Sequence, residues 1–117
     1  MGRFALAMVA FLFSLGVSAQ EYAGTWTAKH PNGSVITLVL EQQGPGGVTG
    51  TLQGSGGRFD VDAEVRADGL VGLVSGENAM VYLTGRITGA TLHVLLMEPK
   101  PTGEPDEATR RIIRFTR

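Results

Sequence analysis

Few residues in this sequence are able to do chemistry, and their spacing fits no common site. There are two histidines, His30 and His93, no cysteine, and neither a His-x-His nor a His-Glu-x-x-His motif. Because a zinc site needs three or four converging ligands, we expect no metal and no other cofactor. His30 stands before Pro31 in a turn, and His93 stands in a predicted strand.

The sequence gives no better support for a nucleophilic or an acid–base catalytic site. Three serines stand near turns, and none stands in a strand–turn–helix elbow: Ser34, Ser55 and Ser75. Asp60 and Asp62 share one face of a predicted strand with Arg58, Glu64 and Arg66, which indicates a solvated face of mixed charge. The glycine-rich stretches 44–47 and 54–57 precede no predicted helix, so they lack the helix N-terminus that helps a phosphate-binding loop to hold its anion. We therefore expect no enzymatic activity.

The first 19 residues have the pattern of a secretory signal peptide. Arg3 gives a positive start, residues 4–17 are almost all apolar, and small residues lead up to Ala19. The apolar stretch is shorter than the roughly 20 residues of a spanning helix, although a retained membrane anchor is the alternative. We expect a signal peptide over 1–19, a single domain over 20–117, and a periplasmic or secreted protein.

Composition restricts the function classes further. The formal net charge is −1, so the basic excess typical of a nucleic-acid-binding protein is missing. The chain has no cysteine, so an exported form has no disulfide to stabilise it. Its stability must then come from packing and from closing the sheet.

Short runs with a period of two, separated by turn residues every 8 to 12 positions, indicate an all-β protein. We expect eight strands, at 23–29, 34–42, 47–53, 58–66, 69–75, 79–87, 90–97 and 108–116. Short connections throughout predict an antiparallel up-and-down meander, and pairing the first strand with the last closes it into a barrel without edges. Asn32-Gly33 suits a turn with positive φ at both central residues.

Small residues at inward positions of these strands predict space inside the barrel. They are Gly24, Ala28, Gly50, Ala63 and Gly72. Larger apolar residues would line that space, and we take five of them as candidate ligand-binding residues: Leu38, Leu40, Phe59, Val61 and Val94. An eight-stranded barrel is just wide enough to be filled by side chains or to hold one small ligand.

Strands predicted at 69–75, 79–87 and 90–97 are apolar on both faces. Met80, Tyr82, Leu95 and Met97 would then point outward together. A monomer rarely exposes so large an apolar patch, so one hypothesis is a homodimer through this face. The alternative is that the last strand or the loop at 98–107 covers it. That proline-rich loop forms no strand in our prediction, and it is either a lid over a barrel mouth or a simple spacer.

The only tryptophan lies in Gly24-Thr25-Trp26, at the start of the first predicted strand. With Thr49-Gly50-Thr51 and a C-terminal arginine, this motif resembles the calycin group of small barrels, which includes lipocalin-like and avidin-like proteins. The resemblance implies that Trp26 closes one barrel end and that Arg114 or Arg117 packs across its ring. Biotin sites in the avidin branch use several tryptophans, so biotin binding is not implied. The alternative for Trp26 is contact with a ligand.

Two functions follow as expectations. The first is an exported barrel that binds a small apolar ligand or a peptide in its interior or mouth. The second is a protein-interaction or inhibitor module of the cell envelope, acting through its loops or its outer apolar face. A lined, dry void of about 300 Å³ or more would favour ligand binding, and a filled barrel interior would favour the interaction module.

Overall fold

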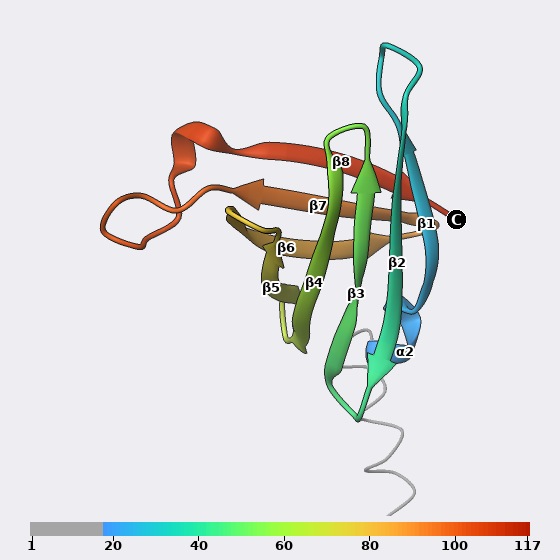
Figure 1. Ribbon diagram of the computed structural model, residues 1–117. Helices are drawn as coiled ribbons and strands as arrows, with labels where there is room; N and C mark the ends of the chain where they lie inside the picture. Colours follow the sequence, from blue (N-terminus) through green and yellow to red (C-terminus); the bar gives the residue numbers. More distant parts are fainter. Residues whose placement is uncertain (1–17) are drawn as a thin grey trace, which may run out of the picture.

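The computed structural model describes residues 18–117, and these form a closed barrel of eight antiparallel strands in sequence order (Figure 1). The strands are β1 (Gly24–Lys29), β2 (Val35–Gln43), β3 (Gly47–Gly54), β4 (Gly57–Arg66), β5 (Gly69–Ser75), β6 (Met80–Thr88), β7 (Thr91–Met97) and β8 (Arg111–Thr116). The predicted up-and-down meander is therefore confirmed. The predicted signal peptide falls largely on residues 1–17, outside the described part of the chain.

Alternation of apolar and polar residues sets which side of each strand is buried. On β4, Val61 and Ala63 are buried, whereas Asp60, Asp62 and Glu64 are exposed. On β8 the alternation leaves Phe115 buried and its neighbours in the strand exposed. The buried apolar residues of all strands form one cluster, so the core lies inside the barrel.

The turn after β1 differs from the prediction. Gly33 has φ 93°, but no residue other than glycine has a positive φ in the described chain, so Asn32 does not adopt it. Instead the Asn32 side-chain oxygen accepts hydrogen bonds from the backbone N–H and the hydroxyl of Ser34, at 2.9 and 2.7 Å. This side-chain turn replaces the expected two-residue hairpin turn, because asparagine readily binds its own backbone two residues on.

Glycines in the middle of strands let the sheet coil tightly. A Cβ added at Gly50 would lie 1.8 Å from the carbonyl oxygen of Val39, and one at Gly72 would lie 2.5 Å from the Cβ of Ala63. The space predicted at these two positions is therefore taken by neighbouring backbone. In Figure 1, β6, β7 and β8 cross β2 and β3 steeply, which such close approaches allow.

A short helix that the sequence pattern did not predict covers one end of the barrel. It is α2 (Ala19–Tyr22), and it directly precedes β1. Ala19 and Tyr22 are both buried and belong to the core cluster. The end of the barrel at which β1 begins is therefore closed by residues from before the first strand.

The loop between β7 and β8 is folded rather than extended. Pro99 and Pro105 face each other in an isolated bridge, and the Asp106 N–H donates to the Glu98 carbonyl oxygen at 2.8 Å. The Tyr82 hydroxyl donates to the Gly103 carbonyl oxygen, so the loop reaches the outer face of β6. The 3-10 turn η1 (Glu107–Thr109) follows, and β8 therefore begins three residues later than predicted.

Candidate functional site

Trp26 lies at the closed end of the barrel and is fully buried. Its indole N–H donates to the carbonyl oxygen of Tyr22 in α2, at 2.9 Å. The guanidinium carbon of Arg117 lies 4.2 Å from the centroid of the Trp26 ring. The same guanidinium donates to the carbonyl oxygens of Glu21 and Ala23, each at 3.0 Å. Helix α2, the first strand and the last residue are thus held together around one ring.

Arg117 is the arginine that covers the ring, and Arg114 is not part of this arrangement. Arg114 is exposed on β8 and points away from the core. A cation over an aromatic face at an exposed site contributes about 0.5–1 kcal/mol, and the indole itself buries a large apolar area. The geometry favours Trp26 as a plug of the barrel, since α2 and Arg117 cover the ring.

Beside this plug lies a pocket of about 190 Å³, lined in part by Tyr22, Arg66 and Arg86. Burial raises the pKa of the Tyr22 phenol above its ordinary value of 10.0, and the positive charge of Arg86 partly offsets this effect. Arg66 pairs with Glu64, and Arg86 donates to the Asp68 carbonyl oxygen at 3.4 Å. Both guanidinium groups therefore already have partners.

The five candidate ligand-binding residues lie in or next to the core. Leu38, Leu40, Val61 and Val94 are each 2% exposed or less. Phe59 is half-buried, and its ring lies so close to Gly76 that a Cβ there would be 2.7 Å from it. None of the five lines the pocket beside Trp26 or the cavity next to Ile113. Their contact with a ligand stays a prediction.

The barrel is weakly closed where its first and last strands meet. β1 and β8 pair at one position, Thr27 with Thr116, whereas β7 and β8 share six pairs, from Thr91–Thr116 to Leu96–Arg111. Residues 111–115 of β8 therefore have a strand partner on the β7 side and none on the β1 side. Phe115 is fully buried, whereas Arg111, Ile112 and Arg114 are exposed and Ile113 is half-buried, so residues 111–114 form a strand edge that β1 does not pair with.

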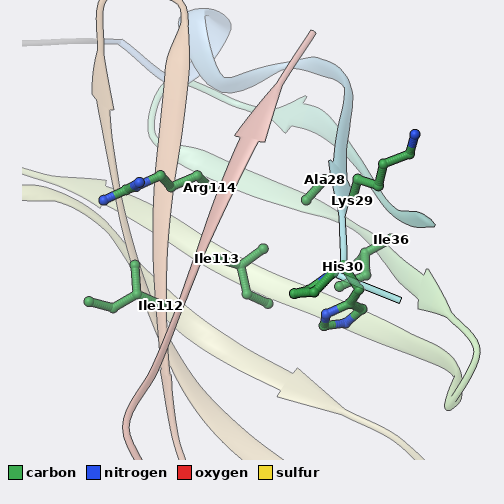
Figure 2. Close-up of a pocket in the computed structure, with 8 residues that line it drawn as sticks. Ala28, Lys29, His30, Ile36, Ile112, Ile113 and Arg114 are labelled. Atoms are coloured by element: carbon green, nitrogen blue, oxygen red, sulfur yellow. The ribbon is translucent and has the colours of Figure 1, made fainter. Parts of the chain in front are cut away.

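A cavity of about 370 Å³ lies at this open seam. Figure 2 shows Ile113 of β8 pointing toward Ala28 and Ile36, while Ile112 and Arg114, which also line the cavity, project on the other side of β8. The His30 ring lies near the same apolar group. Ala28 is the only one of the small inward residues that lines the cavity, so the space lies at the seam and not at the barrel centre.

Four arginines lie at and around β8: Arg110, Arg111, Arg114 and Arg117. Arg110 lies 3.9 Å from a Glu107 carboxylate oxygen, and Arg117 lies over Trp26. Within residues 18–117, no carboxylate lies within 4.0 Å of the Arg111 or Arg114 guanidinium. The open edge of β8 is therefore positively charged.

Metal ligands do not gather in the described part of the chain, where no group of three His, Asp or Glu side chains is close enough to hold an ion. His30 is exposed and His93 is half-buried. No helix among residues 18–117 is long and apolar enough to cross a bilayer.

The outer face of β5 to β7 carries the apolar rows expected from the sequence. Leu73, Tyr82 and Met97 are in register across the three strands. Leu73 is 38% exposed, and Val71 on the same strand is 40% exposed. Tyr82 is half-buried and bonded to the loop at Gly103. The loop thus covers one part of this face and leaves Leu73 and Val71 open.

The sequence did not predict the open seam between β1 and β8, because the pattern of residues within each strand does not reveal how far two strands diverge. One signal was present: all four charged residues of "RRIIRFTR", residues 110–117, are arginine, and positive charge is a common protection of edge strands. Comparison of the whole chain with known protein families, with curated proteins and with solved structures finds no match.

Proposed function

We propose that this protein binds an extended peptide segment of a partner protein, which adds as a strand to the free edge of β8. The observation that carries the proposal is the single β1–β8 pair, which leaves residues 111–115 without a strand on one side. Unpaired backbone donors and acceptors at a sheet edge are a template for another strand. Main-chain hydrogen bonds give such binding its affinity, and pockets for alternate side chains give it specificity.

The cavity beside the edge supports this mode of binding. Ala28, Ile36 and Ile113 form its apolar wall, next to the part of β8 that has no strand partner. A strand added along β8 would direct every second side chain toward this wall. The volume of about 370 Å³ falls in the range of ligand sites, at the lower end. One or two apolar side chains of the peptide would occupy it.

The proposal takes the peptide form of the first expected function and involves no catalysis. It places the protein in the periplasm or outside the cell, as the N-terminal sequence pattern suggests. We further propose that the chain is a distant calycin-like barrel. The Gly-x-Trp at 24–26, the sequential closed meander and the arginine over the ring support this relationship.

The test uses an acetylated and amidated probe peptide, Ser-Val-Thr-Val-Thr-Val-Ser, titrated into the protein under NMR observation. We expect the largest amide shift changes in residues 111–115 of β8. The same peptide with N-methyl groups at alternate residues cannot donate those hydrogen bonds, and we expect it not to bind.

A pair of matched variants tests the cavity. Ile113→Ala removes part of the apolar wall, whereas Ile87→Ala makes the same deletion beside the pocket at the other end. We expect weaker peptide binding for Ile113→Ala and unchanged binding for Ile87→Ala. Shift changes confined to other strands, or equal binding of the N-methylated peptide, would contradict strand addition at β8.

A further inference from the structure

We infer that the partner segment is acidic, with carboxylates at the positions that lie beside Arg114 on the outer face of β8. This inference rests on the proposed function and names the chemistry of the partner. A strand added to β8 would place alternate side chains beside Ile113 and beside Arg114. The segment should therefore alternate apolar and acidic residues.

The arginines of β8 carry the argument. Arg111 and Arg114 are exposed and have no carboxylate within 4.0 Å among residues 18–117. Both belong to the stretch of β8 that has no strand on the β1 side. An opposite charge directly across from an arginine on a neighbouring strand stabilises the pair, and a like charge destabilises it.

Neighbouring strands add to the same charge pattern. Arg114 is in register with His93 on β7, and His93 is in register with Arg86 on β6. These three side chains form one row across the outer face, with no acidic residue in it. An added strand would extend this row by one position, next to Arg114. A glutamate at that position would lie directly across from Arg114 on β8.

The same charges argue against a second copy of this chain as the occupant. Pairing the β8 edge of one copy with the β8 edge of another would bring two positively charged strands together, each with Arg111 on one face and Arg114 on the other. Such juxtaposition of like charges is a common protection of sheet edges against self-association. An acidic segment from another protein is favoured where a second copy is repelled.

The experiment compares three peptides that share the Ser-Val-x-Val-x-Val-Ser frame and carry Glu, Gln or Lys at both x positions. We expect the Glu peptide to bind about fivefold tighter than the Gln peptide, and the Lys peptide to bind most weakly. The advantage of Glu over Gln should shrink as salt is added, because exposed charges are screened.

Two arginine variants locate the effect. Arg114→Gln should remove most of the difference between the Glu and Gln peptides, while Arg58→Gln, on the exposed face of β4, should leave it unchanged. Equal binding of all three peptides would overturn the acidic preference but not strand addition at β8. It would mean that the arginines only oppose self-association of the strand edge. Failure of every peptide to bind would overturn both proposals.

Discussion

Arg117 and Trp26 join the two ends of the described chain: the guanidinium carbon lies 4.2 Å from the ring centroid. Two hydrogen bonds from the same guanidinium to the carbonyl oxygens of Glu21 and Ala23 fix the segment that follows α2. One side chain thus holds both the plug and the start of β1. This contact supports closure at the end of the barrel where β1 and β8 do pair.

Replacement of Arg117 should therefore lower stability. Arg117→Met keeps much of the side-chain length but loses the charge and both hydrogen bonds, so we expect a loss of about 1–3 kcal/mol. In a domain of this size, each kcal/mol corresponds to a fall in Tm of about 4–8 °C. Arg114→Met is the matched control and should leave Tm nearly unchanged. Equal melting of both variants, by circular dichroism, would contradict the role of Arg117.

Glycine at position 50 should be indispensable for the coil of the sheet. Gly50→Ala puts a Cβ 1.8 Å from the Val39 carbonyl oxygen, so strands β2 and β3 must separate. We expect a loss of several kcal/mol or a failure to fold. Gly56→Ala is the control, because a Cβ there has nothing within 4 Å and the φ angle is not positive. A stable Gly50→Ala protein in urea unfolding would contradict the close approach.

The strands follow local sequence patterns closely, whereas helix α2 and the start of β8 do not. Alternation in β4 and the glycine-rich turns predicted the strands to within a few residues, because both depend on local chemistry. Helix α2 was missed because Ala19 stood inside the predicted signal peptide and four residues carry no periodicity. The late start of β8 follows from Asp106, whose side chain accepts the Ala108 N–H at 3.0 Å and begins a 3-10 turn.

The site itself could not be predicted from the same patterns. Gly50 and Gly72 suggest empty space when each strand is considered alone, but close backbone contacts between strands fill that space. The cavity at Ile113 depends on how far β8 diverges from β1, which is a property of the coiled sheet as a whole. Of the two arginines proposed for Trp26, Arg117 lies over the ring, whereas Arg114 lines the cavity next to Ile113.

Tyr22 should make stability fall at high pH. Burial raises the pKa of its phenol in the folded protein above the ordinary value of 10.0. The folded state therefore holds the proton more tightly than the unfolded state, and this contribution is complete below about pH 10. It is lost as the pH rises through the folded-state pKa.

The measurement is the free energy of unfolding between pH 8 and about pH 11. We expect a smaller fall above pH 10 for Tyr22→Phe than for the unchanged protein. Tyr82→Phe, which leaves the buried phenol in place, should keep the full fall. Identical curves for the unchanged protein and Tyr22→Phe would show that the buried phenol is not responsible.

The outer face of β5 to β7 makes self-association a separate prediction. Leu73 and Val71 stay exposed beside Tyr82 and Met97, and we predict a dimer through this face at high micromolar concentration. Leu73→Lys should sediment as a monomer, and Val35→Lys, exposed on β2, should still sediment as a dimer. If the unchanged protein sediments as a monomer in analytical ultracentrifugation, the dimer is contradicted. The loop at Gly103 would then be the only cover proposed for this face.

Hydrogen exchange along β8 tests the free edge most directly, and it needs no ligand. In an antiparallel edge strand, alternate amides point toward the paired neighbour and the others toward solvent. We predict that amides of residues 111–114 alternate between slow exchange, where they bond to β7, and fast exchange, where they face the seam. Slow exchange at every one of these amides would show that β8 is paired on both sides, and the proposed peptide site would then not exist.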